Sequence, residues 1–236
     1  ITTSKGNILL HTGMPSSGPM IEASIKKLGF KPEDIKYIIT SHAHIDHVGG
    51  RAYMKKITGA EIVMIDAEKE LFESGGKIYF HYGLYPEFLF EPLKVDKVIK
   101  NGDSLKLGEI TMIAIHTPGH TKGSTSWLFN ITDNGKTYLV VCPDGSSISH
   151  GYRVEVDPSY EGIGNNYIKT LDILSALKPD IWLSSHTDYF DFEKKSKLSE
   201  KEGVNAWTDP EGYKKRIEGE RKKLEKKIKL VKSSKK

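Results

Sequence analysis

The sequence predicts a mixed α/β (α+β) fold in which two β-sheets are sandwiched between helices. Two observations lead to this prediction. Apolar stretches with strand character alternate with segments whose apolar residues recur at helical spacing, and the second half of the chain is rich in hairpin signals. The chain has 236 residues, of which 37% are hydrophobic. It can therefore bury a sizeable core, and we expect one domain over residues 1–236.

Strand-like and helical segments follow one another through the first half of the chain. The pattern predicts strands at residues 8–10, 37–40 and 62–65, and helices at residues 20–28, 48–57 and 67–72. Residues 1–6 read as the middle of a hairpin. Residues 73–92 lose periodicity while they gather glycine, proline and aromatic side chains, which is typical of a functional loop.

The second half of the chain combines hairpins with two helices. Strand-like runs lie at residues 110–115, 138–142 and 181–183, and Asn101-Gly102-Asp103 and Asp133-Asn134-Gly135 are turn signals. A helix is predicted over residues 166–177. Residues 210–236 are expected to form a basic C-terminal helix and tail, whose apolar face, including Tyr213, Ile217 and Leu224, docks on the body.

A run of metal-binding residue types directly follows the predicted strand at residues 37–40. His42, His44, Asp46 and His47 place three imidazoles and a carboxylate within six residues. Zinc takes imidazole nitrogen and carboxylate oxygen at ~2.0–2.2 Å. Core packing explains such a cluster poorly, and the alternative is a set of surface histidines beside an N-cap aspartate. The run is therefore interpreted as a metal cradle.

Two more histidines follow strand-like segments. His120 lies in Thr117-Pro118-Gly119-His120-Thr121, and His186 follows residues 181–183. Six donors on three such loops suggest two metals. One site would use His42, His44 and His120, and the other Asp46, His47 and His186. Three protein ligands and an open position are typical of a catalytic site, because structural zinc sites are closed by four ligands.

With these residues, the chain resembles the metallo-β-lactamase superfamily, whose hallmark is H-x-H-x-D-H followed by two later histidines. Within it, the chain is similar to the third subclass of the class B β-lactamases. The segments that carry the resemblance are residues 6–10, 28–30, 41–50, 75–77 with 81–82, 117–124 and 180–192. The resemblance implies the four-layer αβ/βα sandwich of that family. Its members usually carry several strands before the point where Ile1 falls, so we expect N-terminal strands beyond residues 1–236.

The resemblance also implies an activity, which is hydrolysis of the amide of β-lactam antibiotics with two zinc ions per chain. Zinc lowers the pKa of bound water toward ~7, so that a zinc-bound hydroxide can attack the amide carbonyl. Asp46 would orient that hydroxide as a catalytic residue. The resemblance further implies a monomer that acts on a small molecule, binds neither nucleic acid nor membrane, lies in the periplasm or outside the cell, and confers antibiotic resistance.

Some residues are assigned to the substrate and to the support of the ligands by this resemblance. Ser146 and Ser147 occupy the region whose serines bind the drug's carboxylate, and Tyr82 in the long loop would pack on an apolar face of the substrate; ordinary loop polarity and core packing are the alternatives. The superfamily commonly has Leu-x-Asp-Thr-Gly where this chain has His11 in Leu9-Leu10-His11-Thr12-Gly13. His11 would then lie behind the ligands. Because it stands in place of an aspartate, one negative charge near the metals would be missing.

Other functions on the same scaffold stay open. A lactonase, thioesterase or phosphodiesterase would use an aspartate that bridges both metals, and Asp144 lies in the corresponding neighbourhood, although Pro143 replaces the usual glycine before it. We expect Asp144 to lie outside the ligand set. A non-enzymatic binding module is a third hypothesis, but it would not need all six donors.

Composition limits the remaining possibilities. A net charge of +4 arises from 35 basic and 31 acidic side chains, and the basic excess gathers in residues 214–236. This pattern indicates a solvated helix face and tail rather than a nucleic-acid surface. The single cysteine, Cys142, excludes an intramolecular disulfide and is expected in the core. Neither a signal peptide nor an apolar run long enough to cross a bilayer is present, so the predicted location rests on the resemblance alone.

Overall fold

The computed structural model describes residues 1–233, with side chains to residue 230. These residues form two compact units. Unit 1 comprises Ile1–His116 and Thr121–Thr125, and unit 2 comprises Thr117–His120 and residues 126–233. Strands and helices occur in both units and form two sheets with their helices, so the predicted mixed α/β class is confirmed. Residues 234–236 of the predicted C-terminal tail lie outside the described residues.

A five-stranded sheet with the order β1-β2-β3-β4-β5 lies in unit 1. Its strands are β1 (Thr2–Thr3), β2 (Gly6–Leu10), β3 (Ile35–Ile39), β4 (Glu61–Ile65) and β5 (Lys97–Ile99). As expected, β1 and β2 form an antiparallel hairpin, whereas β2 to β5 are parallel. The carboxyl ends of β2 and β3 therefore share one edge of the sheet, where open α/β sheets present functional groups.

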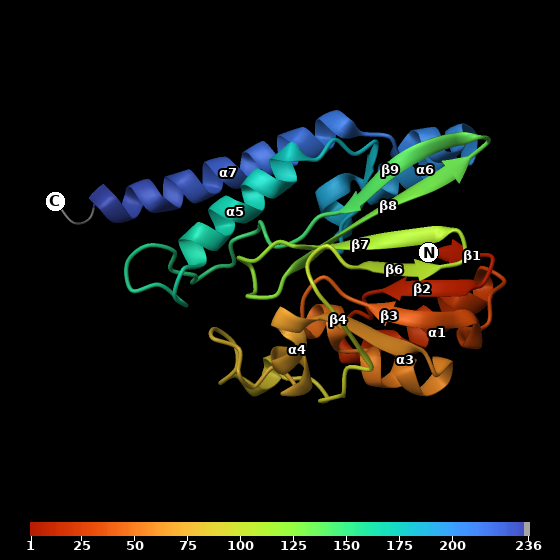
Figure 1. Ribbon diagram of the computed structural model, residues 1–236, viewed down its shortest axis with the longest axis horizontal. Coiled ribbons are helices and arrows are strands. Elements are labelled where there is room, and N and C mark those ends of the chain that lie inside the picture. Colours follow the sequence, from red (N-terminus) through yellow and green to blue (C-terminus); the bar gives the residue numbers. More distant parts are fainter. Residues whose placement is uncertain (234–236) are drawn as a thin grey trace. The chain divides into compact units, whose positions relative to one another are not determined.

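Unit 1 has seven helical segments within the described residues, four α-helices and three 3₁₀ helices. They are η1 (Pro15–Ser17), α1 (Gly18–Lys27), η2 (Pro32–Asp34), α2 (Ile45–Val48), α3 (Arg51–Thr58), α4 (Asp66–Glu73) and η3 (Pro86–Phe88). Figure 1 shows α1 and α3 on the same side of β3, where their apolar faces close a core around Ile38 and Met54. Amphipathic helices on a parallel sheet bury their apolar stripe in this way.

The predicted single helix over residues 48–57 is wrong at its start. The chain forms the short α2 and then α3, separated by Gly49 and Gly50. A Cβ atom on Gly49 would lie 2.4 Å from Pro15 Cδ, and one on Gly50 would lie 2.4 Å from the carbonyl oxygen of Thr12. The segment after β2 therefore passes so close to this point that only glycine fits.

The second sheet has the order β10-β9-β8-β7-β6. Its strands are β6 (Ser104–Leu107), β7 (Ile110–His116), β8 (Thr125–Asp133), β9 (Lys136–Cys142) and β10 (Ile181–Trp182). In the β8–β9 hairpin, Asp133 pairs with Lys136, and the two residues between them, Asn134 and Gly135, have φ of 48° and 77°. Positive φ at both positions defines the type I′ turn that the Asn-Gly signal predicts. Cys142 is buried as expected, and burial raises the pKa of its thiol to about 12.

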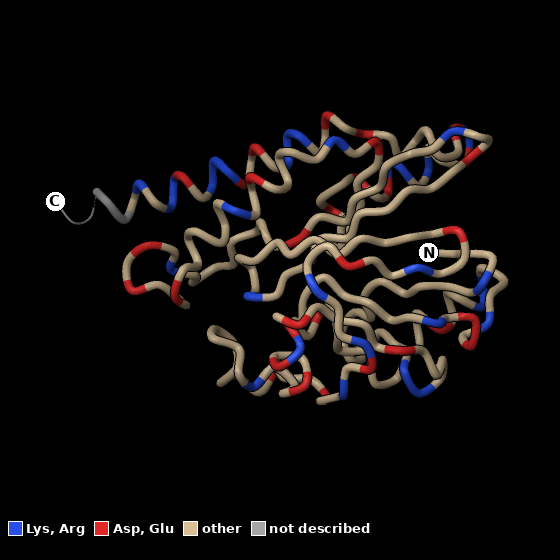
Figure 2. The backbone as a smooth tube through the Cα atoms, in the orientation of Figure 1, with Lys and Arg blue, Asp and Glu red and all other residues tan. Residues whose placement is uncertain are grey.

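The helical segments of unit 2 are α5 (Ile163–Ala176), η4 (Thr187–Phe190), α6 (Phe192–Glu202), η5 (Gly203–Trp207) and α7 (Pro210–Ser233). Helices α5 and α7 lie side by side (Figure 1), held by the bond from the Tyr213 hydroxyl to the carbonyl oxygen of Leu174 at 2.8 Å and by the 2.7 Å ion pair of Arg221 with Asp172. Basic and acidic residues are interspersed along α7, as Figure 2 shows. Among the described residues, no helix is long and apolar enough to cross a membrane.

Candidate metal centre

The metal-binding run leaves the sheet of unit 1 directly after β3. The Thr40 hydroxyl donates to the carbonyl oxygen of His42 at 2.9 Å, and the amide of His47 donates to the carbonyl oxygen of His44 at 2.9 Å. His44 is the N-cap of α2, so Asp46 lies in the first helical turn. This compact path turns neighbouring residues of the run toward one place.

Three of the imidazoles in unit 1 lie together. The ring centroid of His42 is 4.6 Å from that of His44 and 4.0 Å from that of His47. The Nε2 atom of His47 lies 3.4 Å from a carboxylate oxygen of Asp46. His42 and His47 are buried, whereas the side chain of Asp46 is 42% exposed. Of these residues, Asp46 is therefore the one whose side chain solvent reaches most.

His11 contacts the cluster from behind. Its Nδ1 atom lies 3.1 Å from His47 Nδ1, and its Nε2 atom lies 3.2 Å from the Ser41 hydroxyl. If His47 binds a metal through Nε2, its Nδ1 carries the hydrogen and donates to His11. His11 has φ of 68°, a left-handed conformation in which histidine, asparagine and aspartate are several-fold enriched.

His120 has its orientation fixed within unit 2. Its Nδ1 atom lies 2.9 Å from the carbonyl oxygen of Ser147, and the Tyr152 hydroxyl donates to the carbonyl oxygen of His120 at 3.0 Å. Because a carbonyl oxygen only accepts, Nδ1 must be the donor, and Nε2 keeps its lone pair. In this tautomer, Nε2 is the ring nitrogen that can bind a metal ion.

His186 follows β10 at the start of η4. Its ring lies 5.2 Å from that of Tyr189, and the Arg216 guanidinium of α7 lies 3.8 Å from the centroid of the Tyr189 ring. Arg216 in turn pairs with Glu220 at 3.1 Å. The long C-terminal helix therefore supports the loop that carries this predicted ligand.

The six predicted donors form two groups of three. Nitrogen atoms of His42, His44 and His120 make one group, and a carboxylate oxygen of Asp46 with nitrogen atoms of His47 and His186 makes the other; donor atoms within a group lie within 4.8 Å of one another. Neither group includes Asp144. Imidazole with or without one carboxylate is the donor set of catalytic zinc, which binds such atoms at ~2.0–2.2 Å. The residues therefore fit zinc.

Asp144 and the two predicted substrate serines lie in the loop after β9. The Asp144 carboxylate accepts from the amide of Gly145 at 2.7 Å, and the Asp144 amide donates to the Ser126 hydroxyl at 2.9 Å. Ser146 is buried, whereas Ser147 is half-buried and its carbonyl oxygen accepts from His120 and, at 3.1 Å, from the Tyr167 hydroxyl. Ser147 thus has a supporting contact that sequence patterns do not reveal.

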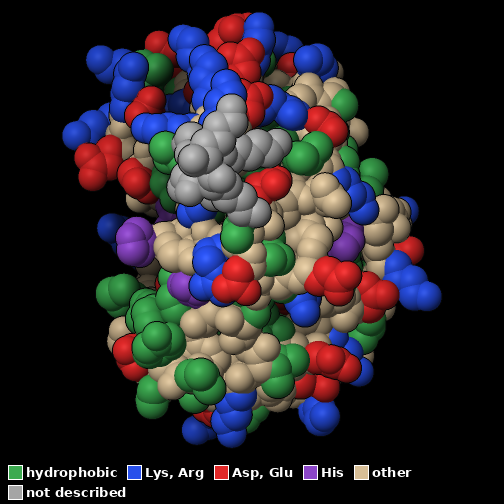
Figure 3. Space-filling model, turned by 90° about the vertical axis from the view of Figure 1, so that its left-hand side faces the viewer, with side chains coloured by type: hydrophobic (Ala, Val, Ile, Leu, Met, Phe, Trp, Pro, Cys, Tyr) green, Lys and Arg blue, Asp and Glu red, His purple; other side chains and the backbone are tan. Residues whose placement is uncertain are grey.

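Aromatic residues of the long loop in unit 1 make a wall beside His44. The Tyr79 ring lies 4.6 Å and the Tyr82 ring 6.0 Å from that of His44, and Phe88 stacks on Tyr82 at 4.3 Å. Burial, followed by the nearby charge of Asp46, raises the pKa of Tyr82. The tip of the loop exposes Leu84, and Figure 3 shows hydrophobic side chains gathered over this part of the surface. We call Tyr79, Tyr82 and Phe88 the aromatic wall.

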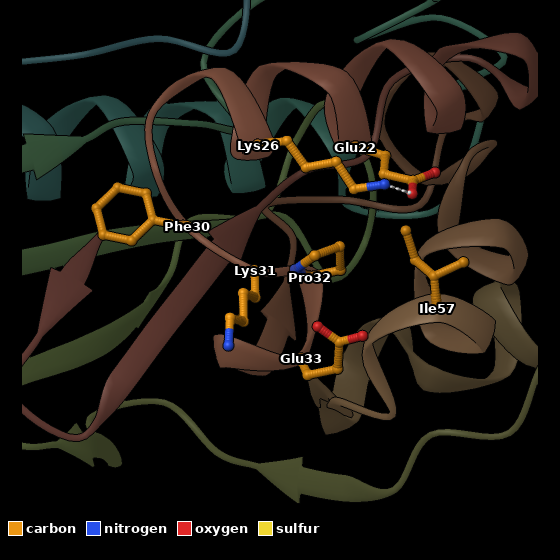
Figure 4. Close-up of a pocket in the computed structure, with 7 residues that line it drawn as sticks. All are labelled: Glu22, Lys26, Phe30, Lys31, Pro32, Glu33 and Ile57. Atoms are coloured by element: carbon orange, nitrogen blue, oxygen red, sulfur yellow. Dashed lines mark hydrogen bonds and ion pairs between the residues drawn. The ribbon is translucent and has the colours of Figure 1, made fainter.

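A separate pocket of unit 1 contains none of the predicted site residues. It is lined by α1, the segment that follows it and α3, and encloses about 470 Å³ (Figure 4). The ammonium of Lys26 and the carboxylate of Glu22 pair within it at 2.5 Å.

Comparisons with known proteins identify the family of the chain. A family model described as the metallo-β-lactamase superfamily matches residues 1–133, more than half of the chain. The structure is similar to the native FEZ-1 metallo-β-lactamase from Legionella gormanii, with a TM-score of 0.94 and 36% identity, covering 98% of this chain and 88% of that one. It is also similar to LRA-12, a class B3 di-zinc metallo-β-lactamase from an Alaskan soil metagenome, with a TM-score of 0.88 and 34% identity, covering 96% and 85%.

Curated relatives include enzymes that are named as lactonases. An N-acyl homoserine lactonase from a Bacillus species is 28% identical over 179 residues, which is 66% of this chain and 66% of that relative. The match thus spans just under two thirds of the lactonase.

Proposed function

The chain belongs to the metallo-β-lactamase superfamily of hydrolases, and we propose that it is a zinc-dependent enzyme that opens the amide of β-lactam antibiotics. The observation that carries this proposal is the similarity to FEZ-1 over 98% of the chain at 36% identity. The lactonase match covers 66% of the chain at 28% identity. The di-zinc neighbour LRA-12 supports two zinc ions per chain.

We assign one ion to His42, His44 and His120, and the other to Asp46, His47 and His186. When bound, zinc supplies a Lewis acid and water of lowered pKa. The chain supplies the orientation of its ligands. His120 is turned to offer Nε2 by the bond from its Nδ1 to Ser147, and His47 is turned in the same way by His11.

Asp46 is the proposed catalytic carboxylate. Its exposed side chain adjoins His47 Nε2, so it can orient the attacking water through one oxygen and hold the proton that the water loses. The water oxygen bonds to the carbonyl carbon, the carbon–nitrogen bond of the ring breaks, and the ring nitrogen takes a proton. No side chain of the protein forms a covalent bond to the substrate.

The aromatic wall is the proposed apolar side of the substrate site. Tyr82 and Phe88 present stacked rings next to His44, which suits the flat side groups of β-lactams. The Ser147 hydroxyl is our candidate for binding the substrate carboxylate. Ser146 is only 8% exposed, so it would contact substrate with little surface.

A lactonase is the second candidate, and the lactonase relative favours it. The two readings differ at Asp144, which would bridge both metals in a lactonase. Here its carboxylate accepts from Gly145 within its own loop, and it belongs to neither donor group. This arrangement supports the β-lactamase.

A substrate panel tests the proposal. Protein loaded with zinc is assayed for kcat/KM with a chromogenic cephalosporin, an N-acyl homoserine lactone, a glutathione thioester and a phosphodiester, with Asp46→Asn as the matched inactive control. We expect the cephalosporin to be the best substrate. A lactone, thioester or phosphodiester cleaved far better than the cephalosporin would overturn the proposal.

We also propose that the protein acts as a monomer in the periplasm or outside the cell, where it would confer resistance. An enzyme that destroys β-lactams protects a cell best where the drug first arrives. Fractionation of cells that express the full gene, light scattering of the protein, and the minimal inhibitory concentration of a cephalosporin measure these three points.

A further inference from the structure

A carboxylate outside the donor groups is buried beside the metal-binding run. Glu68 lies in the first turn of α4 and is only 1% exposed. A buried carboxylate is costly unless hydrogen bonds or cations compensate its charge. The burial of Glu68 therefore needs an explanation. Glu70 of the same helix needs none, because it is exposed to solvent.

The two oxygens of Glu68 bind two different segments of unit 1. Oε1 accepts from the amide of Ala43, the residue between His42 and His44, at 2.8 Å. Oε2 accepts from the hydroxyl of Thr121 and from the amide of Gly123, both at 2.9 Å. Charge-assisted bonds of this kind are roughly twice as strong as neutral ones.

The second of these segments is built to reach Glu68. A Cβ atom on Gly123 would lie 2.4 Å from the amide nitrogen of Glu68, so a side chain there would push the segment away from α4. Thr121 is fully buried, and its amide and hydroxyl both contact the Ser124 hydroxyl, at 3.0 and 2.9 Å. Because Thr121 follows His120 in the chain, the place of Thr121 limits where His120 can lie.

We propose that Glu68 is a positioning residue of the metal centre: it ties the peptide between His42 and His44 to the segment that follows His120. One carboxylate thereby sets the spacing of the three ligands assigned to one ion. Its negative charge also lies one residue from two of those ligands, where it favours a bound cation. This inference rests on the ligand assignment of the proposed function but not on the substrate.

A merely structural role makes a different prediction. A carboxylate that only holds the fold together would lower stability when replaced, with and without zinc, by the same amount. Replacement of a positioning residue would in addition weaken zinc binding at the site assigned to His42, His44 and His120. Replacing residues that hydrogen-bond to metal ligands typically costs ~10–100-fold in metal affinity.

The experiment measures zinc affinity of the whole protein by competition with a chromophoric chelator, together with thermal melting with and without zinc. In Glu68→Gln, the side chain keeps its shape, but an NH₂ group replaces one acceptor oxygen. Glu70→Gln removes the same charge from the same helix and is the matched control. We expect Glu68→Gln to lower the zinc affinity of the site assigned to His42, His44 and His120 by about tenfold or more. The same variant should reduce the rise of Tm on zinc addition, whereas Glu70→Gln should change neither quantity.

Thr121→Val carries the test if Glu68→Gln does not fold. It removes the hydroxyl that donates to Oε2 and nearly keeps the side-chain shape, and Thr121→Ser restores that hydroxyl. Thr121→Val should weaken zinc binding, and Thr121→Ser should return it toward the original affinity. Equal zinc affinity in all variants, with Tm lowered equally in the apo and zinc forms, would overturn the role of Glu68. Zinc binding that depends on Glu68 in a protein that leaves β-lactams intact would instead refute only the proposed function.

Discussion

Replacing His11 by aspartate should tighten zinc binding at the site assigned to Asp46, His47 and His186, which we call the second site. His11 Nδ1 lies 3.1 Å from His47 Nδ1, and the bond is between two neutral groups when His47 binds metal through Nε2. A neutral hydrogen bond contributes roughly 0.5–1.5 kcal/mol and one to a charged group roughly 1.5–3 kcal/mol. The gain of about 1 kcal/mol corresponds to about fivefold tighter zinc. The left-handed φ of 68° is no obstacle, because aspartate also tolerates it.

The assay is stepwise zinc competition against a chelator, which gives one affinity for each ion. His11→Asn is the matched control, since asparagine has nearly the shape of aspartate without its charge. We expect the aspartate variant to retain the second zinc at lower free metal and the asparagine variant to stay close to the original protein. Equal affinities for the aspartate and asparagine variants would refute the reasoning that charge behind His47 matters.

Four further substitutions test the metal site and an ion pair of unit 2. His47→Ala or His186→Ala should lower the zinc content from about two ions to about one, because the remaining three-histidine group still forms a complete site; loss of both ions would show cooperative assembly. Asp144→Asn should leave the zinc content at about two and reduce cephalosporin hydrolysis only modestly, whereas a lost ion would favour the lactonase. Burial raises the pKa of Asp209, but the bond from Lys195 at 2.7 Å and other donors outweigh it and hold that pKa below its usual range. Its contribution is therefore present at neutral pH and lost as the pH falls through the lowered pKa. Asp209→Asn should then cost about 1 kcal/mol in urea unfolding at pH 7 and much less at a pH below that lowered pKa. The same cost at both pH values would count against this ion pair.

The two donor groups could be proposed from the sequence because their chemistry is local. His42 to His47 follow the end of a strand within six residues, and His120 and His186 each follow another strand. The apolar runs mark the strands in the sequence, so the loops that follow these strands could be located. The break between α2 and α3 was not, because Gly49 is required by Pro15, which is distant in sequence.

Glu68 is the functional residue that sequence reasoning missed. On a short, charged helix, Glu68 and the exposed Glu70 look the same. Only tertiary structure brings Ala43, Thr121 and Gly123 to one of them. Helix α6 was missed for a related reason, since most of Phe192–Glu202 is charged or polar and its apolar periodicity is weak. The glycine of Thr121-Lys122-Gly123-Ser124 is the one signal that could have indicated a close approach.

A zinc titration of the verified apo-protein tests the central claim most directly. Bound zinc is measured by mass spectrometry at each step, and the rate of hydrolysis of a chromogenic cephalosporin is measured on the same sample. The two three-ligand groups predict no hydrolysis without metal, a rate that rises with bound zinc, and a plateau at about two ions per chain. Full activity in the apo-protein, or no cephalosporin hydrolysis with two zinc ions bound, would contradict the account.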